Sequence, residues 1–318
     1  MSDMSCSLLS CDHATDDDFL SMADYGSALP RWCPGCGDHS LLSAVQRLLE
    51  SEQLKREKTV FCSGIGCSSR FPHYMKTYGF HSIHGRALPV ATGIKMTRPD
   101  LDVFAVMGDG DCCSIGAAHW VHAIRYNVNM VAMLLDNNIY GLTKNQTSPT
   151  TPQGHASNTQ PLGSYLPALN PLAVTLGITN ASFVAQTADW APAHLYQTIR
   201  AAFKHKGFAF VRVLQRCPVF TPGVYQEAVR KPDVVELLIH KDGVRDKDVE
   251  GLYKHHIQHD PSNLAEARRL AEASGSIRLG LFYRNEQNAR YDKLRELPKY
   301  TAQEKIDLLN AELDQYAV

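Results

Sequence analysis

Two short apolar segments of this chain each end in a cluster of Gly, Asp and Asn, and this pairing constrains the fold more than any other feature. Residues 102–107 (DVFAVM) lead into GDGD (108–111), and residues 130–135 (MVAMLL) lead into DNNIYG (136–141). The apolar runs have the length and composition of buried strands, and residues 114–126 between them have helical spacing. The pattern predicts a βαβ unit whose parallel strands place their carboxyl ends at one edge of a sheet.

The polar residues at this edge form a candidate cradle for a metal ion and a diphosphate. Mg²⁺ binds about six oxygens, which come from carboxylates, amides, backbone carbonyls, phosphates and water. Asp109, Asn137 and the carbonyl of Ile139 are the candidate protein ligands. The backbone N–H groups of Gly110 and Asp111, at the start of the next helix, would receive the phosphates. The alternative is an ordinary strand-to-helix turn capped by Asp111, but the position of Asn137 favours the cradle.

The motifs of the chain resemble those of a known enzyme family. A Gly-Asp-Gly sequence followed about 28 residues later by Asn137 looks like the thiamine diphosphate signature. The surrounding motifs resemble the β subunits of the 2-oxoacid:ferredoxin oxidoreductases and occur in family order: WCPGCG (32–37), GIGCSSR (64–70), HGRA (84–87), GDGD (108–111), DNNIYGLT (136–143) and QRCP (215–218). This resemblance implies a doubly wound, mainly parallel α/β sheet flanked by helices, the thiamine diphosphate-binding fold, with Mg²⁺ as a second cofactor.

The resemblance also assigns cofactor contacts to residues that follow the predicted strands. These residues are Ile65, Gly66, Cys67, Ser68, His84, Gly110, Asp111, Gly141 and Leu142. The loop 65–68 would line the thiazolium side, His84 would lie beside the cofactor as a catalytic residue, and residues 141–142 would close the diphosphate. Ile65 and Leu142 fit equally well as core residues. A histidine at position 84 is also common at a protein surface or helix start.

Four of the nine cysteines flank the same predicted sheet edge. Cys33 and Cys36 form a CxxC motif whose Pro-Gly centre turns both thiols toward one metal site, and Cys67 and Cys217 each follow a predicted strand. A closed Cys₄ zinc site and an iron–sulfur cluster both fit this spacing. The resemblance implies that these four cysteines hold one [4Fe–4S] cluster. Beside a redox cofactor such a cluster can accept electrons one at a time, whereas zinc cannot.

Arg70 is the candidate specificity residue. It follows Cys67 by three positions, on the loop that faces the reacting carbon in the resembled family, and a guanidinium binds a carboxylate through two hydrogen bonds. A second carboxylate distinguishes 2-oxoglutarate from pyruvate, and GCSSRFP (66–72) resembles the 2-oxoglutarate branch. We therefore expect Arg70 to bind the substrate carboxylate. The alternative is a salt bridge from Arg70 to another chain.

The resemblance implies oxidation of a 2-oxoacid with coenzyme A as acyl acceptor and an external ferredoxin as electron acceptor, in either direction. In this family a separate α subunit supplies the glutamate that activates thiamine diphosphate, so we expect an (αβ)₂ assembly. A pyruvate or broad-range 2-oxoacid enzyme is the nearest alternative. A non-oxidative thiamine diphosphate decarboxylase and a non-catalytic zinc-holding scaffold subunit are more remote alternatives.

Composition agrees with an enzyme subunit that works inside the cell. The 318 residues carry a net charge of −1 with dispersed basic residues, so nucleic acid is not an expected partner. No apolar segment approaches the roughly 20 residues that span a bilayer, so a membrane is not expected either. The polar, acidic N-terminus lacks the pattern of an export signal, which predicts a cytoplasmic protein.

The chain is expected to contain three regions. These are a polar tail (1–25), a domain that binds thiamine diphosphate, Mg²⁺ and the cluster (26–222), and a charged, mostly helical C-terminal extension (223–318). Asp38 is predicted to cap a helix that reaches Leu49. Residues 147–169 are predicted to form a long functional or partner-binding loop. Residues 241–260 read as a mixed-charge linker, and residues 302–316 as a helix.

Overall fold

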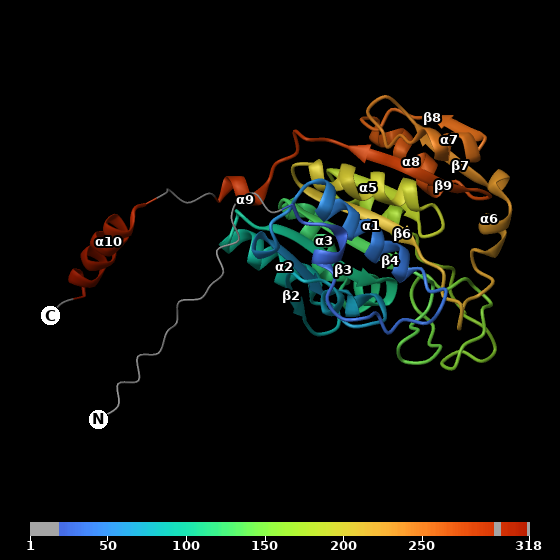
Figure 1. Cartoon of the computed structure of the whole chain (residues 1–318), viewed down its shortest axis with the longest axis horizontal. Helices are drawn as coiled ribbons and strands as arrows, with labels where there is room; N and C mark the ends of the chain where they lie inside the picture. The colour runs from blue at the N-terminus through green and yellow to red at the C-terminus, as the bar shows by residue number, and fades with distance from the viewer. Residues whose placement is uncertain (1–18, 296–299, 317–318) are drawn as a thin grey trace.

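The fold is built on one mainly parallel sheet, as predicted. The computed structural model describes residues 19–295 and 300–316, in which nine strands run in the order β2-β1-β3-β4-β6-β5-β9-β7-β8 (Figure 1). They are β1 (Thr59–Ser63), β2 (Tyr78–His81), β3 (Asp102–Gly108), β4 (Met130–Asp136), β5 (Phe183–Ala188), β6 (Phe208–Leu214), β7 (Val235–Ile239), β8 (His255–Gln258) and β9 (Ile277–Arg284). Among these nine strands of the described residues, only β5 and β9 pair antiparallel. Most of the predicted tail lies outside the described residues.

The predicted βαβ unit is present at the centre of the sheet. Strands β3 and β4 are parallel, with Gly108 opposite Leu135, so their polar carboxyl ends meet at one edge. Every residue of β4 is buried. Helices cover both faces of such a sheet, and its strands therefore read as continuous apolar runs without alternation.

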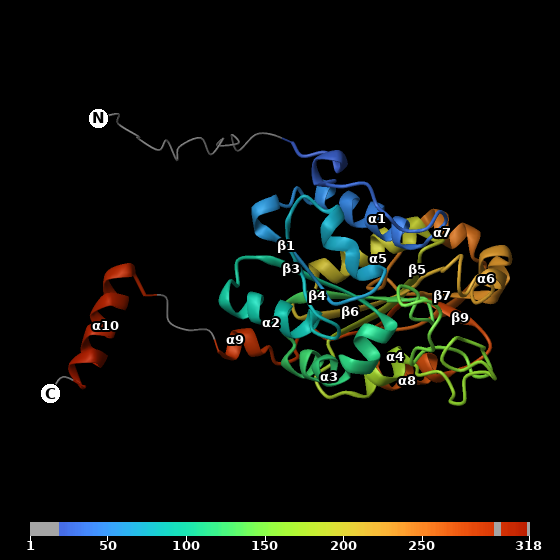
Figure 2. The ribbon, with the colours of Figure 1, turned by 90° about the horizontal axis from the view of Figure 1, so that it is seen from below.

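Two layers of helices sandwich the sheet (Figure 2). One layer contains α2 (Ala87–Thr97), α3 (Ala117–Tyr126), α4 (Pro171–Gly177) and α8 (Leu264–Glu272), and the other contains α1 (Asp38–Ser51) and α5 (Pro192–Lys204). On the α1 and α5 side, Phe104 stacks between Phe61 and Phe203 with ring centroids 4.9 and 5.9 Å away. On the other side, Trp120 of α3 stacks on Phe210. These aromatic contacts hold both helix layers against the strands that carry the cradle.

Asp38 is the first residue of α1 and not its cap, so that prediction was wrong. Gly37 occupies the cap position, and no side chain caps the helix there. Asp38 is fully buried, and one of its carboxylate oxygens lies 3.4 Å from the thiol of Cys36. Burial raises the pKa of Asp38 to about 7. The CxxC turn, closed by a hydrogen bond from the Cys36 N–H to the Cys33 carbonyl (3.1 Å), carries the aspartate inward.

The C-terminal region contributes strands as well as the predicted helices. Strand β9 lies beside β5, so the sheet continues past residue 222, and the predicted linker 241–260 contains α7 (Lys247–Leu252) and β8. The strands were missed because β8 is a polar, exposed edge strand and because charged residues interrupt the apolar pattern around β7 and β9. The remaining helices of this region are α6 (Gln226–Arg230), α9 (Tyr291–Leu294) and α10 (Ala302–Asp314).

Helix α10 confirms the helix predicted near the C-terminus. The hydroxyl of its cap Thr301 accepts a hydrogen bond from the N–H of Glu304, whose carboxylate accepts one from the N–H of Thr301. Every described residue from Tyr300 onward is exposed, and α10 lies away from the sheet (Figures 1 and 2). Among the described residues, no helix combines the length and the apolar character needed to cross a membrane.

Candidate active site

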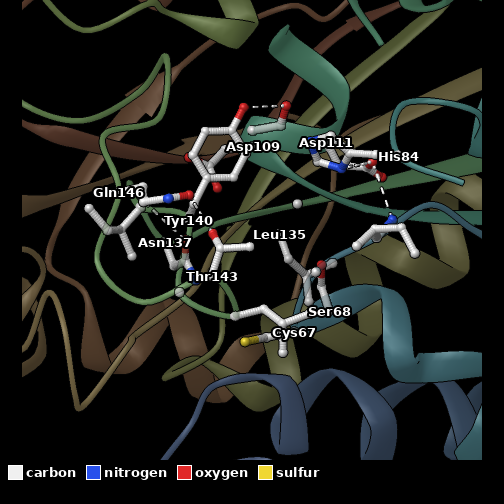
Figure 3. Close-up of a pocket in the computed structure, with 17 residues that line it drawn as sticks. Cys67, Ser68, His84, Asp109, Asp111, Leu135, Asn137, Tyr140, Thr143 and Gln146 are labelled. Atoms are coloured by element: carbon white, nitrogen blue, oxygen red, sulfur yellow. Dashed lines mark hydrogen bonds and ion pairs between the residues drawn. The ribbon is translucent and has the colours of Figure 1, made fainter. Parts of the chain in front are cut away.

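A cavity of about 310 Å³ lies at the carboxyl ends of β1, β3 and β4 (Figure 3). Its walls come from residues 65–68 after β1, 108–111 at the end of β3, and 137 and 139–143 after β4, together with His84 from the segment that follows β2. The predicted thiamine diphosphate contacts and Mg²⁺ ligands all line it: Ile65, Gly66, Cys67, Ser68, His84, Asp109, Gly110, Asp111, Asn137, Ile139, Gly141 and Leu142. Segments far apart in the sequence therefore meet at the carboxyl ends of the strands, the sheet edge that the motifs predicted.

Asp109 is buried at the point where β3 ends. Its carboxylate accepts hydrogen bonds from the hydroxyls of Ser148 and Thr150, the latter at 2.7 Å. Within the described residues, no Lys, Arg or His pairs with Asp109. Burial raises the pKa of Asp109 to about 7, and the nearby carboxylate of Asp136 adds to this effect. A buried carboxylate without a basic partner is suited to a bound cation.

The negative charge of Asp136, at the end of the neighbouring strand, is balanced by an arginine. The guanidinium of Arg212 donates to one of its oxygens at 2.6 and 2.8 Å, and both side chains are largely buried. Asn137 follows directly, lines the cavity and accepts a hydrogen bond from the N–H of Ile139 (3.2 Å). The cavity therefore offers one unpaired carboxylate, one amide oxygen and nearby backbone carbonyls, which is the donor set of a hard cation such as Mg²⁺.

Gly110 permits the close approach of β4's loop to the end of β3. A Cβ atom at position 110 would lie 2.0 Å from the ring of Tyr140, whose hydroxyl donates to the carbonyl of Gly110 at 3.1 Å. The chain then makes one π-helical turn, η4 (Asp111–Ile115), before α3 begins at Ala117. The predicted helix at 114–126 thus starts three residues later than expected. Such wide turns often occur at functional sites.

Asp111 joins three segments around the cavity and does not cap its own helix. Its carboxylate accepts hydrogen bonds from the N–H groups of Gly85 (2.6 Å) and Ile65 (3.3 Å). His84 Nδ1 lies 2.9 Å from the same carboxylate, while one third of the His84 side chain stays exposed. Burial raises the pKa of Asp111, and the N–H donors and His84 oppose that rise. Asp111 therefore fixes His84 at the cavity wall.

The CxxC motif packs against the segments that carry the other two predicted cluster ligands. On one side of the motif, the indole of Trp32 donates to the carbonyl of Cys67 at 2.7 Å. On the other side, the N–H of Gly37 donates to the carbonyl of Arg216, directly before Cys217, at 3.1 Å. These contacts bring the CxxC motif next to Cys67, which lines the cavity, and next to the segment that carries Cys217.

The thiols themselves have few partners. Cys36 accepts a hydrogen bond from the side-chain amide of Gln215 (3.2 Å), and Cys217 accepts one from the N–H of Phe220 (3.5 Å). Burial raises the pKa of Cys67 to about 12. All seven cysteines in the described part of the chain are free, and no group of three or more Cys, His, Asp or Glu side chains there is arranged to hold a metal ion.

Known proteins with similar sequences identify the family. Residues 64–213 match the family described as "Thiamine pyrophosphate enzyme, C-terminal TPP binding domain". The β subunit of a 2-oxoacid:ferredoxin oxidoreductase from Sulfolobus sp is 39% identical over 268 residues, which covers 82% of this chain and 84% of the relative. This chain belongs to the β subunits of the 2-oxoacid:ferredoxin oxidoreductases. Subunit KorB of the 2-oxoglutarate oxidoreductase of Mycobacterium tuberculosis is 48% identical over 66% of the chain but only 56% of its own length.

A solved structure extends the family match beyond the cofactor region. The 2-oxoglutarate:ferredoxin oxidoreductase from Magnetococcus marinus, with 2-oxoglutarate, coenzyme A and succinyl-CoA bound, superposes with a TM-score of 0.76 at 34% identity. The match covers 93% of this β subunit and 97% of that chain, so it includes most of the region after residue 222. The strands that the sequence analysis missed are therefore part of the shared fold.

Arg70, like the predicted cluster ligands Cys33, Cys36 and Cys217, lies outside the cavity wall. It belongs to the short helical segment η3 (Ser68–Tyr74), and its N–H donates to the carbonyl of Cys67 at 3.2 Å. Arg70 is half-buried, and its guanidinium has no hydrogen bond or ion pair with any residue in 19–295 or 300–316. Binding of a substrate carboxylate by Arg70 remains a prediction for this β subunit.

Several residues at the site were not predicted. Tyr140, Thr143 and Gln146 line the cavity, and Ser148 and Thr150 hold Asp109. Tyr140 lies inside a recognised motif, so its contact with the cavity was open to inference. Thr143 is the last residue of the same motif. The contacts of Ser148 and Thr150 depend on how the loop 147–169 folds back over β3, and a segment without periodicity carries no signal for such a long-range contact.

Proposed function

We propose that this β subunit, in complex with an α subunit, converts 2-oxoglutarate, coenzyme A and oxidised ferredoxin to succinyl-CoA, CO₂ and reduced ferredoxin, reversibly. The observation that carries the proposal is the buried carboxylate of Asp109, which has no basic partner among the described residues, in a cavity lined by all the predicted cofactor-binding residues. The choice of substrate rests on the relatives named for 2-oxoglutarate and on the Magnetococcus enzyme with that substrate bound. A broader range that includes pyruvate is the second candidate, because other relatives are named only for 2-oxoacids.

The cradle residues fit thiamine diphosphate and Mg²⁺. Asp109, Asn137 and the Ile139 carbonyl would hold the cation, and the backbone N–H groups of Gly110 and Asp111 would bind the diphosphate. Gly66, which has a positive φ of 146°, lets the loop after β1 form the opposite wall. When bound, thiamine diphosphate supplies the electron sink for decarboxylation. The protein holds and orients the cofactor and excludes water from it.

His84 is the proposed proton-handling residue of this chain. Its Nδ1 is held 2.9 Å from the buried carboxylate of Asp111, which fixes the orientation of the ring. The Tyr140 ring lies 5.9 Å from the imidazole, between centroids, and limits its movement from the other side. A histidine held in this way can donate or accept a proton at the cavity without leaving its position.

Cys33, Cys36, Cys67 and Cys217 are proposed to hold one [4Fe–4S] cluster. Three of these ligands flank the cavity edge, and Cys67 belongs both to the cavity wall and to the cysteine set. Cys67 would therefore hold the cluster at the cavity wall, and a [4Fe–4S] cluster held there would supply one-electron transfer to an external ferredoxin.

The active site requires a second chain. Asp109 and Asp111 are the only carboxylates among the described residues that line the cavity, and both are engaged in the contacts described above. The carboxylate that activates the aminopyrimidine is thus assigned to an α subunit, in an (αβ)₂ assembly in the cytoplasm. Expressed alone, this chain is expected to show negligible turnover of 2-oxoacids. Robust turnover with any artificial electron acceptor would contradict the shared site.

Spectra of the anaerobically purified αβ complex test the proposed function. We expect a brown protein whose visible and paramagnetic spectra change on addition of 2-oxoglutarate and coenzyme A, with ferredoxin reduced in the same mixture. Turnover without an electron acceptor would instead indicate a non-oxidative decarboxylase. A colourless protein with stoichiometric zinc, obtained with intact cluster assembly in the host, would indicate a scaffold subunit. Equal activity with pyruvate would favour the broad-range candidate.

A further inference from the structure

We propose that Thr150, assisted by Ser148, is a positioning residue that fixes the carboxylate of Asp109 for the cation. The proposal rests on the Mg²⁺ site proposed above and adds two residues from outside the recognised motifs. Both belong to the first turn of the loop 147–169, some 40 residues after Asp109 in the sequence. They reach the site only because this loop folds back over the end of β3.

The contacts of the two hydroxyls are confined to one oxygen of the carboxylate. Thr150 Oγ1 lies 2.7 Å from Asp109 Oδ2, and the Ser148 hydroxyl contacts the same atom. Neither hydroxyl contacts Oδ1. Thr150 and Asp109 are 1% and 2% exposed, so water cannot easily replace the contact. The arrangement holds the carboxylate in one orientation and leaves its second oxygen available to a ligand.

Thr150 is itself held between two strand ends. Its hydroxyl also lies 2.7 Å from Oδ1 of Asp136, the residue that Arg212 neutralises. The Asn138 side chain donates to the Thr150 carbonyl at 2.9 Å and to Asp136 Oδ1 at 3.0 Å. The threonine therefore bridges the carboxyl ends of β3 and β4, where the two proposed metal-binding segments begin.

A neighbouring threonine anchors the same turn without touching Asp109. The Thr151 hydroxyl donates to the carbonyl of Asn138 at 2.6 Å and accepts from the N–H of Ser148 at 2.8 Å. At the far end of the loop, the N–H of Leu169 donates to the carbonyl of Pro149. These contacts fix the backbone of the turn. The hydroxyl of Thr150 then fixes the carboxylate of Asp109 relative to that backbone. The Thr151 hydroxyl also lies 3.1 Å from that of Ser148, so Thr151 is a control for loop anchoring that leaves only the Thr150 contact with Asp109 untouched.

The consequence is a specific effect on cation binding. Residues that hold a metal ligand in place contribute about 10- to 100-fold to metal affinity. Thr150→Val keeps the shape of the side chain and removes the hydroxyl. The Mg²⁺ concentration that half-saturates thiamine diphosphate binding is expected to rise about 10- to 100-fold in this variant. Thr150→Ser keeps the hydroxyl and is expected to restore most of the affinity, and Ser148→Ala is expected to cause a smaller rise.

The test measures thiamine diphosphate binding by calorimetry at a series of Mg²⁺ concentrations, on the αβ complex of each variant freed of cofactor. Manganese in place of magnesium gives a second readout, because its paramagnetic spectrum separates bound from free ion. Thermal unfolding of the cofactor-free variants identifies any general loss of stability. Thr151→Val is expected to lower that stability without the rise in Mg²⁺ requirement.

The outcomes separate this proposal from the proposed function. If the wild-type complex binds thiamine diphosphate with Mg²⁺ and Thr150→Val binds it with the same Mg²⁺ requirement, Thr150 has no positioning role. The same conclusion follows if Thr151→Val raises the requirement as much as Thr150→Val, or if Thr150→Ser fails to rescue it. If the wild type shows no Mg²⁺-dependent binding, the proposed metal site itself is wrong.

Discussion

The two halves of the cavity edge are built differently, although both lie at the carboxyl ends of the same strands. In the cradle half, Asp109, Asp111 and Tyr140 are each fixed by hydrogen bonds to other segments of the chain. In the cysteine half, backbone contacts gather the loops, while the thiols of Cys36 and Cys217 accept one weak hydrogen bond each from their neighbours. The fold thus fixes the proposed oxygen ligand Asp109, whereas the proposed thiolate ligands have fewer contacts with the rest of the protein.

This difference predicts that the two halves can be damaged separately. Cys67 is the one proposed cluster ligand that also lines the cavity, and the other three lie outside its wall. A substitution in the cradle should therefore remove thiamine diphosphate and leave iron in place, and a substitution among the outer cysteines should do the reverse. The following experiments test that separation, the role of Arg70 in substrate choice and the pH dependence of Mg²⁺ binding.

The largest effect is expected from Asp109→Ala. This change removes the buried carboxylate of the proposed metal site, so two phosphate charges would face no fixed cation. Thiamine diphosphate binding in the presence of Mg²⁺ should be abolished, as measured by calorimetry on the αβ complex. Iron content should stay at the wild-type value, which controls for unfolding. Unchanged cofactor content in the variant would show that Asp109 is not a metal ligand.

Replacing Cys217 by Ala should produce the opposite result. The anaerobically purified wild type is expected to contain about four irons per chain, and the variant should lose or degrade the cluster. Oxidation of the 2-oxoacid should stop, because without the cluster no group carries electrons from the cofactor to ferredoxin. Mg²⁺-dependent thiamine diphosphate binding should persist. Cys62, a buried cysteine on β1 outside the proposed ligand set, provides a matched control as Cys62→Ala. Equal iron loss in both variants would point to misfolding and not to ligation.

The sequence predicted the cradle because its information is local. A strand, a glycine that admits the Tyr140 ring and a polar residue at the strand end are adjacent in the chain, and the parallel arrangement then brings Asp109 beside Asn137. The roles of Ser148 and Thr150 were not predictable, because only the folded loop brings their hydroxyls to Asp109. The burial of Asp38 escaped prediction for a similar reason, since its surroundings come from distant segments.

The C-terminal strands show the limit of pattern recognition at a sheet edge. Strand β8 begins with the exposed His255 and His256 and has Ile257 as its one apolar residue. Strand β9 pairs with β5 through a shift of register between Val184 and Ala185. Neither strand therefore shows the uninterrupted alternation of apolar and polar residues that predicts a half-buried strand. The family comparison recovers this region because it aligns whole folds and does not depend on local patterns.

A smaller, substrate-specific effect is expected from Arg70→Ala. A charge-assisted hydrogen bond to the distal carboxylate of 2-oxoglutarate contributes about 1.5–3 kcal/mol, which corresponds to roughly ten- to a hundredfold in discrimination. The value of kcat/KM for 2-oxoglutarate should fall by that factor, with little change for pyruvate. Arg70 has no partner of its own among the residues described, so its removal should not break an internal ion pair.

The role of Arg70 is decided by whether Arg70→Ala lowers kcat/KM for 2-oxoglutarate alone or for both substrates. Thermal unfolding and thiamine diphosphate content of Arg70→Ala should match the wild type, which controls for damage to the cluster loop. Equal losses with both substrates would assign Arg70 to the subunit interface or to cofactor positioning. Substrate choice would then rest with residues of the α subunit.

The smallest effect concerns pH and again distinguishes the two halves. Without a cation, burial and the charge of Asp136 raise the pKa of Asp109 to about 7, so the free site holds a proton below that pH. The cation needs the ionised carboxylate, and the proton must leave before it binds. The apparent Mg²⁺ affinity should therefore be constant above pH 7 and fall about tenfold per unit below it. Calorimetry of thiamine diphosphate binding at pH 8, 7 and 6, with limiting Mg²⁺, measures this dependence.

Two controls distinguish the protonation of Asp109 from that of the phosphate groups and from a general effect of pH on the protein. The binding of Mg²⁺ to free thiamine diphosphate, measured at each pH, removes the contribution of the phosphate groups. The iron content at each pH reports on the cysteine half and should not follow the same curve. A Mg²⁺ requirement that stays constant from pH 8 to pH 6 would mean that Asp109 is ionised before the cation arrives. The orientation of the carboxylate by Thr150, and not the release of its proton, would then set the affinity of the cradle.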